Sequence, residues 1–201
     1  MQTIKKEENG LMTNDLVFAK VKPNAIIPTK EEENAGYDIY ACFDEDYMVI
    51  PAHTTRLIPT GIAAAVCDKY YLQVHERGST GSKGMKYGAG VVDSSYRGEI
   101  FICINNINYH SIIISKLDKD ELFSKYSTTD CDGDKGIKYG EDDYDYVYEL
   151  DEYTVIYPYS KAIAQLIVHE VPKMNVQEIS YEELKAIPSK RGTGALGSSG
   201  K

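Results

Sequence analysis

Short apolar runs, rich in β-branched and aromatic residues, recur along the chain between polar turns. Such runs, bounded by Gly, Pro, Asn or Asp, are typical of strands. Their short spacing indicates an antiparallel sandwich or barrel, and we find no strand–helix alternation of the Rossmann kind. We therefore expect an all-β protein. The clearest predicted strands are Leu16–Val21, Tyr70–Val74, Glu99–Ile104 and Ile163–Val168.

A short helix is predicted near the C-terminal end of the sequence. Ser180 and Glu183 have the spacing of a capping box, in which each side chain bonds to the other residue's backbone amide. The helix should end before Pro188, because proline disfavours a helical residue before it. The following tail, at 190–201, is rich in glycine, so we expect it to be flexible until a ligand orders it.

The segment at about 109–157 differs in composition from the rest of the chain. Thirteen acidic and four basic residues lie at 118–152, which gives this stretch the whole net charge of −9. Its many tyrosines and the run Ile112–Ile114 indicate that it folds at least in part. We interpret it as an insertion between two strands of a single domain spanning 1–201.

The charge and the apolar runs also limit the function classes. An acidic chain is a poor general binder of nucleic acid, so an anionic ligand would need a local cationic pocket or a bridging metal. No apolar run has the length of a membrane span, and the N-terminus lacks the apolar core of a signal peptide. We expect a cytoplasmic protein with no membrane or nucleic-acid partner. The widely spaced cysteines indicate reduced thiols: Cys42, Cys67, Cys103 and Cys131.

Three polar stretches are suited to binding or hydrolysing a phosphate compound. Residues 76–84 combine two cations, three hydroxyls and three glycines, and the tail combines Arg191 with closely spaced glycines. Between apolar runs, Asp93 lies at the mouth of a predicted hairpin, where a carboxylate can activate water. Taken singly, each stretch is equally typical of a polar loop, a flexible tail or an Asx turn.

Taken together and in order, five segments resemble the five motifs of the trimeric dUTPase family. They are Ala35–Ala41, Arg77–Gly84, Gly90–Gly98, Ile163–Leu166 and Arg191–Gly200, and the resemblance covers roughly 15–108 and 155–200. It implies a distorted jelly roll (β-clip) that forms homotrimers and hydrolyses dUTP to dUMP and pyrophosphate with Mg²⁺. That reaction removes dUTP and supplies dUMP for dTMP synthesis. It also implies an active site built from three subunits, with the tail of one closing over it.

The resemblance assigns roles to individual residues. Asp93 would activate the attacking water, Gln165 would bind the α-phosphate or this water, and Asp38 would hold Mg²⁺ through water molecules. Tyr96 would pack under the deoxyribose, and the Gly88–Val92 backbone would read the uracil edge. The residues expected to bind substrate are Arg77, Gly78, Ser79, Thr80, Gly90, Val92, Tyr96, Arg191, Gly194, Leu196, Gly197 and Ser198.

Three positions depart from the family pattern. Gly78 replaces the usual serine after the motif-two arginine, and the hydroxyl follows at Ser79. Ala162 replaces an arginine before the fourth motif, with Lys161 as a candidate substitute. Leu196 replaces the aromatic residue that stacks on uracil, and a leucine can cover the base without stacking on it.

Other readings concern a second enzyme and the insertion. A related dCTP deaminase would need a glutamate where this chain has Cys103. A non-enzymatic binding module would hold a regulatory protein, with the insertion as the docking surface, and the two functions can coexist. Large insertions occur in phage-type members of the family. Residues 130–141 partly resemble an EF-hand calcium loop, although position six is Lys135 rather than glycine.

Overall fold

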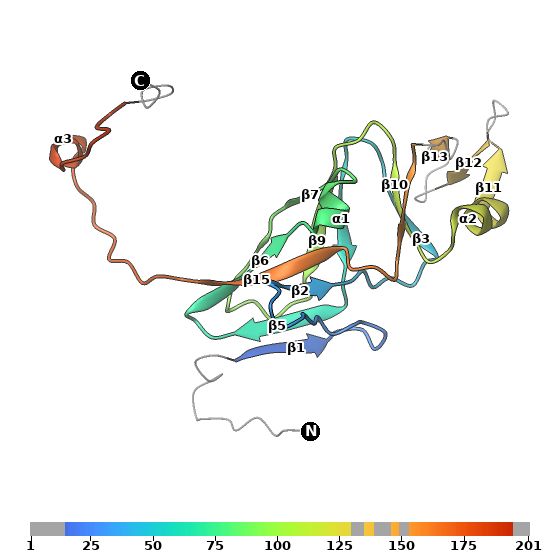
Figure 1. Ribbon diagram of the computed structural model, residues 1–201, viewed down its shortest axis with the longest axis horizontal. Helices are drawn as coiled ribbons and strands as arrows, with labels where there is room; N and C mark the ends of the chain where they lie inside the picture. The colour runs from blue at the N-terminus through green and yellow to red at the C-terminus, as the bar shows by residue number, and fades with distance from the viewer. Residues whose placement is uncertain (1–14, 130–134, 139–145, 149–152, 195–201) are drawn as a thin grey trace. The chain divides into compact units, whose positions relative to one another are not determined.

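The computed structural model describes residues 15–129, 135–138, 146–148 and 153–194. The chain divides into two compact units, Met1–Val171 and Pro172–Lys201. Every strand that the structure describes lies in the first unit (Figure 1), so the all-β prediction is confirmed. The prediction of one domain over 1–201, with an insertion at about 109–157 and a tail at 190–201, stays a prediction.

Small sheets make up the first unit (Figure 1). A four-stranded antiparallel sheet has the order β2-β15-β6-β8, and a three-stranded antiparallel sheet has the order β4-β9-β7. A further pair joins β1 to β5. These strands are β1 Leu16–Lys20, β2 Gly36–Ile39, β4 Thr55–Pro59, β5 Ile62–Val66, β6 Tyr70–His75, β7 Met85–Gly88, β8 Val91–Val92, β9 Phe101–Asn106 and β15 Ala164–Glu170.

The four predicted strands are confirmed as β1, β6, β9 and β15, with ends that shift by at most two residues. The alternation of buried and exposed side chains explains why β9 could be predicted. Ile102 and Ile104 are fully buried, whereas Phe101 is 45% exposed. The inward-facing side chains of these strands join one main core. That core fixes the register of the four-stranded sheet, because a one-residue slip would turn its apolar side chains to solvent.

The segment at 109–157 begins and ends with core strands. Strand β10 (Ile112–Ser115) lies between β3 (Tyr47–Ile50), which is antiparallel to it, and β14 (Val155–Pro158), which is parallel to it. Ile112 and Ile114 belong to the main core, whereas Ile113 belongs to a second apolar cluster. Strand β10 is therefore buried on both faces, which explains its continuous apolar run.

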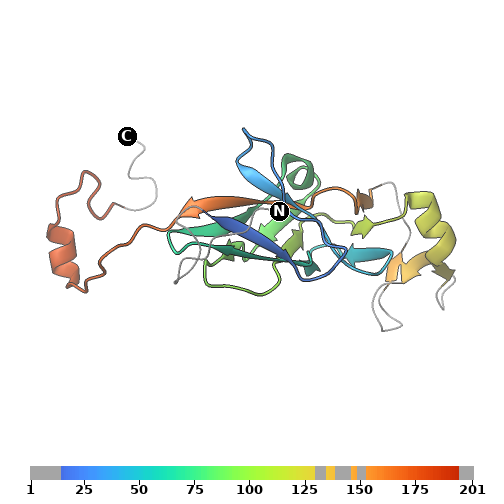
Figure 2. The same cartoon turned by 90° about the horizontal axis from the view of Figure 1, so that it is seen from below.

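A small subdomain between β10 and β14 completes the second cluster with Leu122 and Ile137. Helix α2 (Lys119–Tyr126) packs beside β11 (Ser127–Thr129) and β12 (Lys135–Lys138), as Figure 2 shows, and β12 pairs with β13 (Tyr146–Tyr148). Lys125 and Tyr126 donate to one Asp46 oxygen, at 2.5 and 2.6 Å. The hydrogen bond from Lys125, then that from Tyr126, lowers the pKa of Asp46. The acidic segment thus folds at least in part, as its tyrosines and isoleucines predict.

The second unit carries the predicted C-terminal helix. Helix α3 (Tyr181–Ala186) begins after Ser180, whose hydroxyl accepts from the Glu183 amide at 3.2 Å, while Glu183 accepts from the Ser180 amide at 2.8 Å. The predicted capping box is confirmed, and the helix ends before Pro188. None of the helices described here has the length and apolar character needed to cross a bilayer. Cys42, Cys67 and Cys103 are not in disulfides, and Cys131 lies outside the described residues.

Candidate active site

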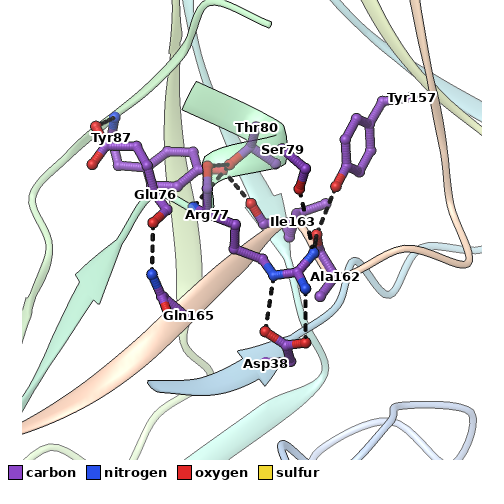
Figure 3. Close-up of polar contacts among 10 residues, drawn as sticks. All are labelled: Asp38, Glu76, Arg77, Ser79, Thr80, Tyr87, Tyr157, Ala162, Ile163 and Gln165. Atoms are coloured by element: carbon purple, nitrogen blue, oxygen red, sulfur yellow. Dashed lines mark hydrogen bonds and ion pairs between the residues drawn. The ribbon is translucent and has the colours of Figure 1, made fainter. Parts of the chain in front are cut away.

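An ion pair joins two of the predicted site segments. Arg77 follows β6, and its Nε and Nη2 donate to Oδ1 and Oδ2 of Asp38 on β2 at 2.9 and 3.0 Å (Figure 3). Strand β15 lies between β2 and β6 and pairs with both, so Gln165 is opposite Asp38 and His75. Sheet pairing thus brings the first, second and fourth predicted motifs to one place.

The guanidinium of Arg77 makes two further contacts. Its Nη1 donates to the Ala162 carbonyl oxygen at 3.3 Å and to the Ser79 hydroxyl at 3.4 Å. Of its five N–H groups, four are directed at protein acceptors. The sequence-based role of Arg77 was substrate binding, and the structure adds that it connects Asp38, Ser79 and the segment before β15.

These residues surround an open polar cavity of about 390 Å³. Its volume is within the range of small-ligand sites. Charge and hydrogen-bonding capacity for a phosphate compound come from the Arg77 guanidinium, the Ser79 hydroxyl and the Gln165 amide. The full lining is Asn34, Ala35, Gly36, Asp38, Arg77, Gly78, Ser79 and Gln165. We refer to it as the phosphate cavity.

The Gln165 side-chain amide has its nitrogen in a hydrogen bond and its oxygen directed at Gly36. Its Nε2 donates to the Glu76 carbonyl oxygen at 2.8 Å (Figure 3). A Cβ on Gly36 would lie 2.5 Å from Gln165 Oε1, so the Gln165 side chain occupies the space that an alanine side chain would need. This explains glycine in the first predicted motif.

Thr80 was predicted to bind substrate, but it does not line the phosphate cavity. It is fully buried in the short helix α1 (Gly78–Gly81), and its hydroxyl accepts from the Arg77 amide at 3.1 Å. This bond fixes the start of the turn that presents Gly78 and Ser79 to the cavity. A direct contact between Thr80 and substrate stays a prediction.

A second cavity of about 230 Å³ contains the predicted water-activating aspartate and the predicted sugar platform. Asp93 closes a turn in which its carbonyl accepts from the Tyr96 amide at 3.0 Å, and Tyr96 is 45% exposed. Val92 also lines this cavity, while the Gly90 carbonyl accepts from the Val74 amide at 2.7 Å and holds the hairpin to β6. The lining is Ala89, Val91, Val92, Asp93, Tyr96, Glu99, Ile100 and Phe101. We refer to it as the hairpin cavity.

The two cavities share no lining residue. The third group of predicted residues lies in the second unit, where Arg191 Nε donates to the Gly194 carbonyl at 2.9 Å. Leu196, Gly197 and Ser198 lie outside the described residues. Within the first unit, the predicted site residues that line a cavity are therefore divided between two cavities.

The phosphate cavity fits a magnesium ion held mainly through water and substrate. Both Asp38 oxygens accept from Arg77, but a carboxylate has about four acceptor positions, so two remain for metal-bound waters. The described residues contain no group of three or more His, Cys, Asp or Glu side chains that could hold a metal directly. Mg²⁺ usually keeps several waters and binds through one or two carboxylates and substrate phosphates, so a single carboxylate such as Asp38 can be its protein partner. The segment at 130–141, which partly resembles a calcium loop but is also typical of a solvated acidic loop, falls largely on residues that the structure does not describe.

Sequence reasoning missed two tyrosines that support the phosphate cavity. Tyr157 Oη donates to the Ala162 carbonyl oxygen at 2.7 Å, and Tyr87 Oη donates to the Ile163 carbonyl oxygen (Figure 3). Burial raises the pKa of Tyr87, so its hydroxyl remains a donor. Both tyrosines act on backbone carbonyls, and such contacts have no signature in residue types or spacing.

Comparisons with a family model and with curated proteins both match this chain to dUTPases. A family model described as dUTPase matches residues 22–119. The deoxyuridine 5'-triphosphate nucleotidohydrolase of Leptospira interrogans is 33% identical over 99 residues, covering 47% of this chain and 68% of the relative. That of Debaryomyces hansenii is 29% identical over 202 residues, covering 100% of this chain and 96% of the relative.

Solved structures extend the likeness to the fold. The dUTPase of Staphylococcus bacteriophage 80alpha with dUPNHPP superposes with a TM-score of 0.64 at 23% identity, covering 94% of this chain and 100% of the other. The dUTPase of EIAV gives a TM-score of 0.51 at 18% identity, covering 83% and 98%. The predicted jelly-roll-like fold of these proteins is confirmed.

Proposed function

The chain belongs to the dUTPase family, whose members hydrolyse dUTP, and we propose that Asp93 and the phosphate cavity carry out this reaction here with Mg²⁺. The observation that supports the proposal is the phosphate cavity. It gathers Asp38, Arg77, Ser79 and Gln165 from three separate parts of the chain. Three of these side chains can donate hydrogen bonds or charge to phosphate oxygens, and Asp38 can accept from metal-bound water.

The phosphates of dUTP occupy the phosphate cavity in this proposal. Gly78 and Ser79 contact the α- and β-phosphates, with Arg77 beside them and Gln165 at the α-phosphate or the attacking water. Mg²⁺, when bound, neutralises phosphate charge and stabilises the leaving pyrophosphate. Asp38 orients the waters of that ion. The tail residues Arg191, Gly194, Gly197 and Ser198 close over the γ-phosphate, which excludes bulk solvent but retains the attacking water.

The nucleoside occupies the hairpin cavity. The Gly90 and Val92 backbone reads the uracil edge, Leu196 covers the base, and Tyr96 packs under the deoxyribose. Asp93 takes a proton from a water molecule while the oxygen of that water bonds to the α-phosphorus. The bond from that phosphorus to the bridging oxygen breaks, which releases pyrophosphate and leaves dUMP.

A homotrimer would complete the active site. The phosphate cavity and the hairpin cavity lie on different parts of one chain and share no residue. The reaction needs Asp93 and the α-phosphate within hydrogen-bonding reach of one water. We propose that neighbouring subunits bring a hairpin cavity, a phosphate cavity and a tail together.

A nucleotide panel tests this function. Purified protein should release pyrophosphate from dUTP, and much less from UTP, dTTP and dCTP. EDTA should stop the reaction and added Mg²⁺ should restore it. Ammonia release from dCTP, measured in parallel, distinguishes a deaminase. Intact dUTP after incubation with Mg²⁺ would contradict the proposal.

A matched pair of glycine substitutions tests the placement of Gln165. In Gly36→Ala the new Cβ would lie 2.5 Å from Gln165 Oε1 and 2.9 Å from its Cβ, so the amide must move. We expect kcat/KM for dUTP to fall about 10- to 100-fold, because small displacements of a positioned group are costly. In Gly81→Ala the nearest atom, Glu76 Cβ, is 3.7 Å away, so turnover should match the wild type. Equal turnover in both variants would contradict this placement of Gln165.

We also propose that the segment at 109–157 binds a regulatory protein. The observation that favours it is the subdomain between β10 and β14, whose Leu122 and Ile137 are buried in an apolar cluster with Val49 of β3 and Ile113 of β10. A phage 80alpha structure is described as that of a dUTPase that controls transfer of virulence genes, and a phage phi11 structure as showing a species-specific insert. Capture of a specific partner by the full chain, lost when this subdomain is replaced, would support the role.

A further inference from the structure

The carbonyl oxygen of Ala162 connects the phosphate cavity to the main core. It accepts from Arg77 Nη1 at 3.3 Å and from Tyr157 Oη at 2.7 Å (Figure 3). A carbonyl oxygen has two lone pairs, so both bonds can form at once. Ala162 is 3% exposed and Tyr157 is 1% exposed, so little solvent competes for this oxygen. The hydrogen bond from Tyr157 is the shorter of the two, so it fixes the position of the Ala162 carbonyl oxygen.

Arg77 needs a fixed acceptor in addition to Asp38. The Asp38–Arg77 pair is about one-third exposed, with side-chain accessibilities of 33% and 30%. The bidentate bond aligns the guanidinium with the Asp38 carboxylate, but the pair is in contact with solvent and the two groups can still move together. The bond to the Ala162 carbonyl holds a third nitrogen of the same plane, on the buried side of the cavity. The guanidinium plane is therefore held by two separate acceptors, the Asp38 carboxylate and the Ala162 carbonyl oxygen.

Tyr157 is well suited to hold that acceptor. Its ring belongs to the main core, and its strand β14 pairs with β10, which is buried along its whole length. The neighbouring carbonyl of Ile163 is held in the same way by Tyr87. Two phenols thus fix consecutive carbonyls just before β15, but only the one held by Tyr157 also contacts Arg77.

We propose that Tyr157 is a positioning residue for dUTP hydrolysis, which acts through the Ala162 carbonyl on the Arg77 guanidinium. The inference rests on the proposed function, because Arg77 affects turnover only if the phosphates bind in the phosphate cavity. Tyr157 itself does not line that cavity. If it acts through the Ala162 carbonyl on Arg77, its effect depends on the side chain at position 77.

The test uses Tyr157→Phe, which keeps the ring in the core and removes only the donor. We expect kcat/KM for dUTP to fall about three- to tenfold, the usual range for one hydrogen bond. The matched control is Tyr126→Phe, which removes the phenol that donates to Asp46 at 2.6 Å. That variant should hydrolyse dUTP like the wild type. Thermal unfolding of both variants, at one protein concentration, separates a loss of stability from a loss of positioning.

A double-mutant cycle shows whether Tyr157 acts through Arg77. Lysine at position 77 lacks the planar fork and cannot hold Asp38 and the Ala162 carbonyl together. Adding Tyr157→Phe to Arg77→Lys should therefore change kcat/KM less than twofold. The same three- to tenfold loss in both backgrounds would overturn the proposal, because independent effects add. So would wild-type turnover in Tyr157→Phe alone.

A measurement without turnover keeps this inference separate from the proposed function. The Nε–H proton of Arg77, identified in ¹H–¹⁵N spectra by its disappearance in Arg77→Lys, should exchange with water faster in Tyr157→Phe. In Tyr126→Phe its exchange should match the wild type. If the wild type left dUTP intact, the proposed function would fail, and this exchange rate would still decide whether Tyr157 holds Arg77. An unchanged rate in Tyr157→Phe would overturn the link.

Discussion

Asp93→Asn is expected to abolish pyrophosphate release from dUTP while leaving dUTP binding largely intact. An amide cannot take the proton from the attacking water, and loss of a general base typically costs about 10²- to 10⁴-fold in rate. The backbone of the turn should persist, because the Tyr96 amide bonds to the Asp93 carbonyl rather than to its side chain. Pyrophosphate release and calorimetric binding of a non-hydrolysable dUTP analogue measure the two properties separately.

Asp44→Asn is a suitable control for the change in charge. The Asp44 side chain is 84% exposed and lies 3.9 Å from Lys22, away from both cavities. Its substitution should leave turnover and binding unchanged. Undiminished turnover in Asp93→Asn would refute the water-activating role, whereas loss of analogue binding would indicate that the carboxylate mainly shapes the hairpin cavity.

Arg77→Ala is expected to lower kcat/KM for dUTP by about 10²-fold, the cost of a misplaced active-site group. The change removes a positive charge from the phosphate cavity and releases Asp38, Ser79 and the Ala162 carbonyl at once. Asp38 is then a carboxylate without its cation, which should repel the substrate phosphates. Steady-state kinetics over a range of Mg²⁺ concentrations would show both effects.

Arg77→Lys is the matched variant for this prediction. It keeps the charge but not the bidentate geometry, so its kcat/KM should lie between those of the wild type and Arg77→Ala. Denaturant unfolding should show similar stability for the two variants, since the ion pair is partly solvated. Activity of Arg77→Ala within threefold of the wild type would exclude the connecting role of this residue.

Local patterns explain why much of the fold could be predicted from the sequence. The β9 alternation and the Ser180 capping box each depend on residues close together in the chain, and both are confirmed. Strand β10 was harder to predict, because residues covering its second face, such as Leu122 and Ile137, follow later in the chain. A run that is apolar on both faces has no period that distinguishes it from other buried elements.

The residue types of the candidate site could be predicted from the sequence, but the hydrogen bonds and ion pairs among these residues could not. The family resemblance suggested Asp38 for a metal and residue chemistry suggested Arg77 for phosphate, but neither revealed that the two side chains bind each other. The Thr80 hydroxyl is of a type that commonly binds phosphate. Only the fold shows that it accepts from the Arg77 backbone amide instead. Contacts to the carbonyls of Ala162 and Ile163 are independent of side-chain identity at those positions.

The parallel pairing of β10 with β14 sets a lower limit on the length of the chain between them. Because both strands run in the same direction, the chain that leaves Ser115 must return along the whole four-residue strand before it enters Val155. A tight hairpin cannot make that return, and such crossovers take about a dozen residues or more. A shortened loop engineered below this length would shift the register of β14 and move residue 157 off its carbonyl, whereas a longer foreign graft would be tolerated.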